Sequence, residues 1–155
     1  MKKYQAAKYP NMKLLNTRYG ENDQAKSRQQ ATDLLTAFPD LQMIVAPTAT
    51  GCPGVAEAIE AAKKAGKVKM TCLATPNGMR DYVKRGTVDG IYLWNMVNLG
   101  YMVLQIAHRL LTGSIKPTDK VSRQAGRARS RQDSNIVLGL AFRFDKDNID
   151  KEVAP

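Results

Sequence analysis

Apolar positions along this chain follow two spacings, one typical of helices and one typical of buried strands. Ala31, Leu34, Leu35 and Phe38 recur at i, i+3, i+4 and i+7, which places them on one face of a helix. Short apolar runs bounded by Gly, Pro, Asn and Asp alternate with such segments and predict strands. The expected strands are 12–19, 41–46, 68–74 and 90–93, and the expected helices are 1–9, one ending at 38, 55–65, 76–86 and 97–111.

This alternation of strand and helix predicts an α/β fold. Right-handed βαβ units give an open parallel sheet with helices on both faces. The chain of 155 residues is long enough for one core and is expected to form a single domain. The pattern breaks after Gly113, since 114–133 is polar and basic and only 136–144 regains strand character. We therefore expect an irregular connection with one or two strands there.

Charge narrows the possible partners only slightly. The 24 Lys and Arg residues outnumber the 14 Asp and Glu residues, which gives a net charge of +10. Most of the cations are spread over helix faces and helix ends, and only 123–131 is a concentrated basic stretch. That stretch lacks interleaved aromatic residues and helical periodicity, which favours a solvated loop over a nucleic-acid site. No nucleic-acid partner is expected.

The two cysteines indicate structural thiols. Cys52 and Cys72 lie 20 positions apart, with no CxxC motif and no histidine cluster, so neither a metal site nor a disulfide framework is predicted. No metal or other cofactor is expected. No apolar run approaches the roughly 18 residues of a membrane-spanning helix. The basic start, 1–8, lacks the apolar core of a secretory signal, so the chain as written is not expected to be exported.

The loops that follow the expected strands carry small polar residues. Parallel strands place their carboxyl ends at one edge of the sheet, so the loops 18–23, 47–53, 74–77 and 94–96 should share one rim. Together these loops offer the neutral groups of Asn22, Thr48, Thr50, Thr75 and Asn95 and the flat ring of Trp94. Such groups suit a small neutral polyhydroxylated ligand, whose hydroxyls need donors and acceptors and whose C–H face stacks on an aromatic ring. The same residue types also serve as helix caps and turn formers, and a lone Trp is often a core residue.

Catalytic motifs are missing from the sequence. It contains no GxSxG, HExxH or GxGxxG, and 51–54 lacks the Gly-Lys-Ser/Thr ending of a phosphate loop. His108 falls within an apolar helix face, where a structural role is expected. Cys52, at a helix start, has no base placed beside it by sequence. The chain is not expected to be an enzyme.

An ordered series of short motifs is similar to a known family. The chain resembles the C-terminal half of periplasmic sugar-binding proteins of ABC transporters, in the branch that contains rhamnose-binding and autoinducer-2-binding proteins. The resemblance rests on 20–27, 37–41, 44–47, 75–80, 83–88 and 93–95, together with Gly139 and the ending 144–150.

The resemblance implies a two-lobed protein that holds a sugar between its lobes. By position in the family's motifs, the ligand contacts would be Asn22, Pro47, Thr48, Ala49, Ala74, Thr75, Trp94 and Asn95. Two departures from the family are visible. Ribose-type relatives carry a carboxylate around Leu73 or Ala74, and the autoinducer branch has Asp where Thr48 follows Pro47 here. The resemblance thus implies a rhamnose-like sugar.

The resemblance also implies that the chain is about half of a binding protein. Residues 1–95 would form the C-terminal lobe, 96–113 a crossover helix that packs on the missing lobe, and 114–155 an irregular segment with strands. We expect the apolar helix 97–111 to be covered by self-association or by a swapped partner. The full-length family is periplasmic and works with a membrane permease. An alternative is the effector-binding domain of a repressor-class transcriptional regulator, which shares the fold but needs a helix-turn-helix, and none precedes Met1.

Overall fold

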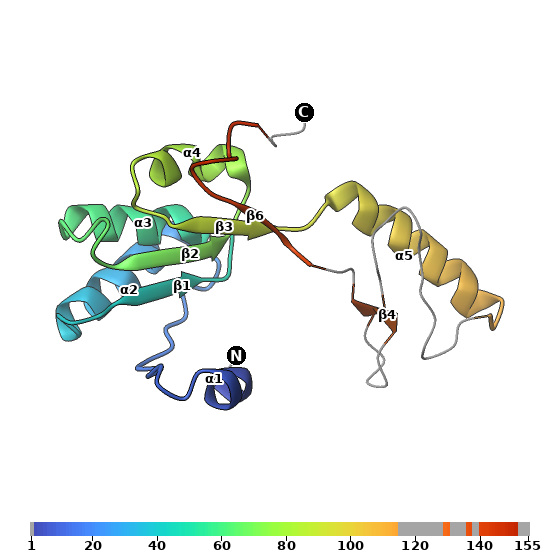
Figure 1. Cartoon of the computed structure of the whole chain (residues 1–155), viewed down its shortest axis with the longest axis horizontal. Coiled ribbons are helices and arrows are strands. Elements are labelled where there is room, and N and C mark those ends of the chain that lie inside the picture. The colour runs from blue at the N-terminus through green and yellow to red at the C-terminus, as the bar shows by residue number, and fades with distance from the viewer. Residues whose placement is uncertain (1, 115–128, 131–135, 138–139, 152–155) are drawn as a thin grey trace.

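The computed structural model describes residues 2–114, 129–130, 136–137 and 140–151 (Figure 1). The basic stretch 123–131 lies outside the described residues except for 129–130. The helices are α1 (Lys2–Lys8), α2 (Gln24–Ala37), α3 (Gly51–Ala61), α4 (Pro76–Lys84) and α5 (Met96–Leu111). The strands are β1 (Met43–Ala46), β2 (Lys69–Leu73), β3 (Gly90–Leu93), β4 (Arg129–Ser130), β5 (Ile136–Val137) and β6 (Phe142–Phe144).

The main sheet has the order β1-β2-β3-β6. β1, β2 and β3 are parallel, with Ala46 opposite Cys72 and Leu73 opposite Tyr92. β6 pairs antiparallel with β3, and β4 and β5 form a separate antiparallel pair. The α/β class and the open, mainly parallel sheet are confirmed.

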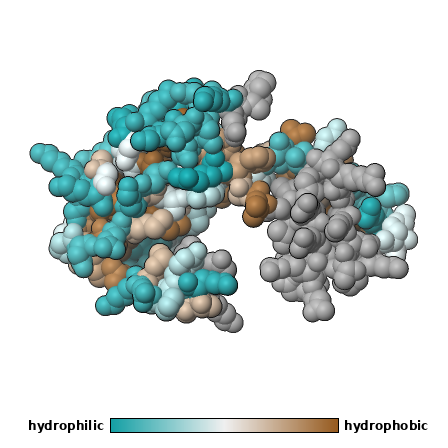
Figure 2. Space-filling view, viewed as in Figure 1, coloured by the Kyte–Doolittle hydropathy of each residue, from teal (hydrophilic) through white to brown (hydrophobic). Residues whose placement is uncertain are grey.

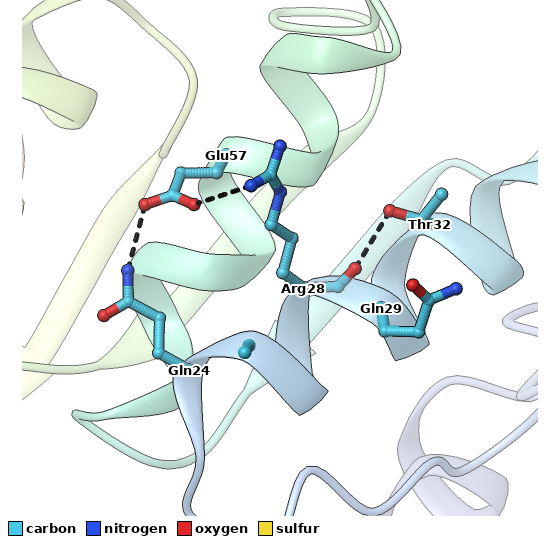
Figure 3. Close-up of a pocket in the computed structure, with 6 residues that line it drawn as sticks. Gln24, Arg28, Gln29, Thr32 and Glu57 are labelled. Carbon is cyan, nitrogen blue, oxygen red and sulfur yellow. Dashed lines mark hydrogen bonds and ion pairs between the residues drawn. The ribbon is translucent and has the colours of Figure 1, made fainter.

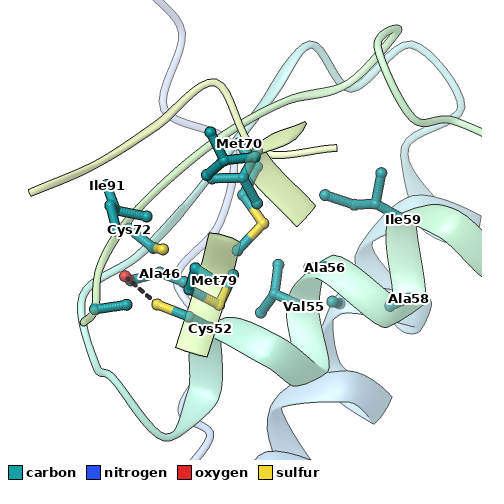
Figure 4. Packing of buried hydrophobic residues seen from close by; sticks show 14 of the residues in the cluster. Ala46, Cys52, Val55, Ala56, Ala58, Ile59, Met70, Cys72, Met79 and Ile91 are labelled. Atoms are coloured by element: carbon teal, nitrogen blue, oxygen red, sulfur yellow. Dashed lines mark hydrogen bonds between the residues drawn. The ribbon is translucent and has the colours of Figure 1, made fainter. Parts of the chain in front are cut away.

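Among the described residues, the helix layer lies on one face of this sheet. Side chains alternate along each strand, and those of Met70, Cys72 and Ile91 enter a core with α3 and α4 (Figure 4). On the opposite face, Met43, Val45 and Tyr92 are 40%, 43% and 40% exposed. This differs from the expectation of helices on both faces. Right-handed crossovers that add strands in one direction send α3 and α4 to the same side of the sheet.

The expected strand at 12–19 does not form, and this prediction was wrong. Residues 12–20 have no regular secondary structure, and Leu14 and Leu15 are exposed. Within the described chain, β1 pairs only with β2, and this segment forms no ladder with the outer edge of β1. A strand is stabilised by its partner, because unpaired peptide groups bond equally well to water. β-Forming composition without an adjacent strand therefore leaves this segment as a connection.

The C-terminal segment returns to the sheet. After β6, residues 145–150 form a turn in which the backbone N–H of Asp145 donates to Asn148 Oδ1 at 2.8 Å. Asn148 Nδ2 in turn donates to the carbonyl of Arg143 at 3.0 Å. This turn delivers Ile149 into the core, where it is 0% exposed. The last described residues thus help to close the core beside β3 and α4 (Figure 1).

The same turn is tied to α4 by Asp150. Its carboxylate lies 2.8 Å from Lys84 Nζ and 3.5 Å from Arg80 Nε. The hydrogen bond from Lys84, with the charges of Lys84 and Arg80, lowers the pKa of Asp150. A carboxyl with a lowered pKa adds stability that is present above the ordinary pKa of aspartate and is lost as pH falls through the lowered value.

Asp150→Asn should therefore lower the urea midpoint of unfolding at neutral pH and should not lower it at strongly acidic pH. Asp147→Asn, in the same turn, is the control, and an equal pH response of both variants would contradict the pairing.

None of the helices that the structure describes is long and apolar enough to span a membrane.

Candidate functional site

Three loops meet at one rim of the sheet. β1, β2 and β3 are parallel and end at Ala46, Leu73 and Leu93. The loops 47–50, 74–75 and 94–95 leave this edge, and each leads directly into a helix, α3, α4 or α5. The first-turn N–H groups of these helices therefore lie at the rim, where they can donate hydrogen bonds to a ligand. The predicted convergence of these three loops is confirmed.

The fourth loop, 20–23, also lies at the rim, although the predicted strand before it does not form. This loop leads into α2. Ser27 of α2, which is 8% exposed, lies between the loop and the start of α3. A Cβ added to Gly20 would lie 2.2 Å from Ser27 Oγ, and one added to Gly51 would lie 2.7 Å from the same atom. Ser27 thus sits between the two glycines and holds loop 20–23 against the start of α3.

These three small residues were missed from the sequence. Gly20 has the pattern of a turn residue, Gly51 was expected in the loop before a helix at 55–65, and Ser27 has the pattern of an ordinary helix position. Their spacing carries no periodic signal, because the contact joins segments about 25–30 positions apart and depends on how α2 crosses α3. The small residues near the starts of α2 and α3 were the only indication of this contact in the sequence.

Loop 20–23 has an uncommon backbone. Glu21 and Asn22 have φ values of 49° and 56°, in the left-handed region that residues with side chains rarely adopt. Asn tolerates this conformation better than most residues. Asp23 then caps α2, since its Oδ1 accepts the backbone N–H of Lys26 at 2.7 Å. The loop is held in one shape with the Asn22 residue exposed.

Capping accounts for part of two predicted contacts. Thr48 Oγ1 accepts the N–H of Gly51 at 3.3 Å, and Asn95 Oδ1 accepts the N–H of Asn98 at 2.9 Å. Each side chain keeps a donor, the Thr48 hydroxyl hydrogen and the Asn95 amide. Thr75 differs, because it is the N-cap of α4 without a side-chain capping bond. Its exposed hydroxyl is therefore available to a ligand as donor and acceptor.

The remaining loop residues divide by exposure. Pro47 and Ala49 are exposed at the rim. Ala74 is 2% exposed and its side chain belongs to the core, so only its backbone can meet a ligand. Sequence position alone could not separate these two roles.

Trp94 lies at the end of β3 with a partly buried ring. Its Nε1 is buried and donates to no acceptor among the described residues. A buried donor without an acceptor typically costs about 1–3 kcal/mol, and buried indole N–H groups usually find a partner. Trp94 is thus not a fully satisfied core residue, and it presents a donor next to the rim.

Cys52 links the ends of two strands beneath the rim. Its Sγ lies 3.0 Å from the carbonyl oxygen of Thr48 and 3.3 Å from that of Leu73. Figure 4 shows the contact of the same atom with the carbonyl oxygen of Ala46, at 3.5 Å. The hydrogen bond with the Cys72 thiol, together with burial, raises the pKa of Cys52. A raised pKa keeps the thiol protonated at neutral pH, whereas a nucleophile needs the thiolate. The geometry favours a structural thiol that holds loop 47–50 against β2.

A separate cavity of about 550 Å³ lies between α2 and α3 (Figure 3). Its polar side chains pair with one another, since Glu57 accepts from Gln24 at 2.9 Å and lies 3.8 Å from Arg28. No residue predicted to contact ligand lines this cavity. The rim and this cavity are therefore different surfaces.

The rim offers hydrogen bonds but little acid–base chemistry. Loops 47–50, 74–75 and 94–95 contain no ionisable side chain, and Glu21 in the fourth loop is ion-paired with Lys26. His108 is exposed in the last turn of α5, so it is not the structural histidine that the sequence suggested. This arrangement suits a neutral ligand with several hydroxyl groups.

Comparison with known proteins gives a consistent picture. Residues 1–115 match the sequence model of the periplasmic binding protein domain. The fold is similar to a sugar ABC transporter protein from Actinomyces odontolyticus, with a TM-score of 0.77, 35% identity, and coverage of 96% of this chain and 50% of that one.

Two further solved structures were determined with ligands. LsrB from Clostridium saccharobutylicum, in complex with AI-2, has a TM-score of 0.75 and 26% identity, with 96% of this chain and 52% of that chain covered. An ABC transporter solute-binding protein from Clostridium phytofermentas, with bound L-rhamnose, has a TM-score of 0.75 and 26% identity, with 96% and 51% covered. This chain spans about half the length of these solved relatives.

Proposed function

The chain belongs to the periplasmic binding protein domain family, and from that premise we propose that it supplies one wall of a sugar site in a solute-binding protein of an ABC transporter. Three loops without ionisable side chains, 47–50, 74–75 and 94–95, meet at one rim and support the proposal. The observation that carries it is the buried Trp94 Nε1, a donor without an acceptor in the described chain, beside exposed hydroxyl and amide groups. A sugar hydroxyl would accept this hydrogen bond, and the C–H face of the sugar would stack on the ring.

The proposed contact residues are the eight that the resemblance implied, and their exposure indicates how each could meet a sugar. Side chains of Asn22, Thr48, Thr75, Trp94 and Asn95 would donate to or accept from sugar hydroxyls. Pro47 and Ala49 would contact the sugar at loop 47–50, and Ala74 would act through its backbone, because its side chain is buried.

The proposed ligand is a rhamnose-like deoxy sugar. A relative of this chain holds L-rhamnose, and the rim here has no carboxylate in its three strand-end loops to grip a more polar sugar. Thr48 stands where the autoinducer-2 branch carries Asp, which disfavours that ligand. A methyl group in place of a hydroxyl suits a rim with neutral groups and one aromatic face.

The location and the partner of the protein are part of the same proposal. In a solute-binding protein, residues 1–95 would form one lobe, 96–113 the crossover helix and 114–155 the closing segment. The protein would work in the periplasm and hand its sugar to a membrane permease. We propose a binding role rather than an enzymatic one, since loops 47–50, 74–75 and 94–95 carry no ionisable side chain, and the carboxylates of Glu21 and Asp23 pair with the ammonium group and the backbone N–H of Lys26.

The single tryptophan makes the test specific. The indole N–H signal of Trp94 in a ¹H–¹⁵N spectrum and its fluorescence report on this site alone. Titration with L-rhamnose should shift both in a saturable way, with a Kd on the order of 1 mM, because one wall supplies only part of the contacts. D-Glucuronate, which is charged, should leave the signal unchanged at equal concentration.

Thr75→Val should weaken the binding of L-rhamnose about 3–10-fold, since it removes one hydroxyl and keeps the side-chain shape. Thr36→Val is the matched control. Thr36 is exposed on α2, and its hydroxyl donates to the carbonyl of Thr32 at 2.9 Å, on an element outside the rim. An indole signal that no neutral sugar moves, in a chain shown to be folded by circular dichroism, would overturn the proposal.

A further inference from the structure

The two cysteines of the chain lie in the same part of the core, beneath the rim. Cys52 is in the first turn of α3, and Cys72 is in β2. Their side chains are 0% and 3% exposed and belong to one hydrophobic cluster, which also holds Met79 and Val83 of α4. Figure 2 shows mainly hydrophilic residues on the outer surface over α4. Both thiols are therefore sheltered from solvent in the folded chain.

The sulfur of Cys52 points toward the strand that carries Cys72. Cys52 Sγ lies 3.5 Å from the carbonyl oxygen of Ala46, and Ala46 is the residue opposite Cys72 in the parallel ladder. The same Sγ lies 3.3 Å from the carbonyl oxygen of Leu73, which follows Cys72 in β2. The Cys52 sulfur thus touches the backbone next to Cys72 on both strands.

The two thiols also interact with each other. The contact with the Cys72 thiol is the largest cause of the raised pKa of Cys52, and burial is the second. A disulfide requires side chains that face each other, with Cβ atoms about 4 Å apart. Thiols in contact from a helix and a neighbouring strand already face each other. Joining them therefore requires rotation of the side chains rather than movement of the strand.

The surroundings of the pair do not favour a metal site. Structural zinc is held by four ligands, usually Cys and His side chains. Among the described residues, no group of three or more His, Cys, Asp or Glu side chains could hold a metal ion. The neighbours of the pair in the cluster are apolar, with Met79 and Ile91 among them (Figure 4). Two thiols without further ligands are suited to bond with each other.

We propose that Cys52 and Cys72 are a site of oxidative modification, at which they form an intramolecular disulfide that joins α3 to β2. The two thiols lose two protons and two electrons, and a bond forms between their sulfur atoms. An external disulfide, such as oxidised glutathione, accepts these protons and electrons and is reduced to two thiols. The raised pKa of Cys52 disfavours the thiolate that must attack the oxidant. The bond should therefore form during folding, before the pair is buried.

The disulfide would connect the elements that carry two of the rim loops. Loop 47–50 leads into α3, where the backbone N–H of Cys52 donates to the carbonyl of Thr48 at 3.1 Å. Loop 74–75 leaves β2 directly after Leu73. A bond between α3 and β2 would also close a loop of about 20 residues, which in the chain-entropy model lowers the unfolding equilibrium constant on the order of 100-fold. This inference does not depend on the ligand that the rim binds.

Peptide mapping of the wild-type chain tests the bond directly. The chain is refolded from urea in a mixture of reduced and oxidised glutathione, and is then unfolded and treated with iodoacetamide without a reductant. We expect no alkylated cysteine. Digestion with trypsin should give the peptides 29–63 and 70–80, each with one cysteine, as one cross-linked species that dithiothreitol separates. Two alkylated cysteines, or disulfides only with glutathione or between separate chains, would overturn the proposal.

Urea denaturation tests whether the bond fits the native fold. The oxidised wild type should unfold at a higher urea midpoint than the same protein kept reduced, because the cross-link restricts the unfolded chain. Cys72→Ala is the matched control, since it keeps Cys52 and removes its partner. The midpoint of this variant should be the same with and without oxidised glutathione. A lower midpoint for the oxidised wild type, or an equal rise in the variant, would count against a native bond between Cys52 and Cys72.

Discussion

Replacing Ile149 by alanine is expected to lower the free energy of unfolding by about 2–5 kcal/mol. The side chain is 0% exposed and enters the core beside β3 and α4 from the last described turn. Alanine would lose the transfer free energy of the missing methyl and methylene groups and would leave a cavity. The unfolding free energy from urea denaturation measures the effect. A loss of this size would show that the C-terminal turn contributes to the core as strongly as the central strands do.

Leu140→Ala is the matched control for this change. It removes a side chain of the same size a few residues earlier in the chain, but Leu140 is 98% exposed. Its effect should stay within about 0.5 kcal/mol. A loss of under about 1 kcal/mol for Ile149→Ala would mean that residues 145–150 do not close the core.

Gly54→Ala is expected to lower the free energy of unfolding by about 1–3 kcal/mol, although alanine favours helices. A Cβ at position 54 would lie 2.3 Å from the carbonyl oxygen of Gln24 and 3.1 Å from the backbone N of Arg28. These are backbone atoms of α2, so they cannot rotate away as a side chain can. The two helices would have to separate. Separation would also pull loop 20–23 away from loop 47–50, so L-rhamnose should bind more weakly in the same variant.

Gly100→Ala is the control for the helix preference of alanine. A Cβ there meets no atom within 4 Å, so this substitution in α5 should be neutral or stabilising by up to about 1 kcal/mol. Urea denaturation of both variants at one protein concentration gives the comparison. If Gly54→Ala were as stable as the wild type, α2 and α3 would have to lie farther apart at this position than the structure shows.

The rim shows how small residues decide the shape of a site. Gly20, Ser27, Gly51 and Gly54 contribute almost no polar surface, yet they set the distance between α2 and α3. The predicted contacts Asn22 and Thr48 sit on the two loops that this contact joins. The shape of the proposed site therefore depends on residues that are not among the predicted contacts.

Much of the fold could be predicted from local patterns. The apolar runs that became β1, β2 and β3, and the helix starts at Pro76 and after Asn95, follow from spacing and capping chemistry that act over a few residues. The parallel arrangement follows from the alternation of strands and helices. The segment 12–19 was mistaken for a strand, because pairing depends on a neighbour that local composition cannot supply.

The candidate site, like the fold, could be predicted only in part from the sequence. That neutral side chains such as Thr48, Thr75 and Trp94 follow the strands could be predicted, since parallel strands end at one edge. That Ala74 turns into the core and that the Trp94 indole N–H is buried without an acceptor could not. Each of these depends on which atoms lie beside the residue in space.

Local sequence patterns account for the order of β1 to β3 and of α2 to α5, for the parallel sheet and for the neutral side chains of loops 47–50, 74–75 and 94–95. Periodicity, turn residues and side-chain chemistry are local properties, because they depend on residues that are close together in the chain. Three features arise only when the chain folds: the single helix layer, the return of Ile149 to the core and the contact of Ser27 with two glycines. These features join segments far apart in the chain, where the free energy depends on close packing that no local pattern encodes.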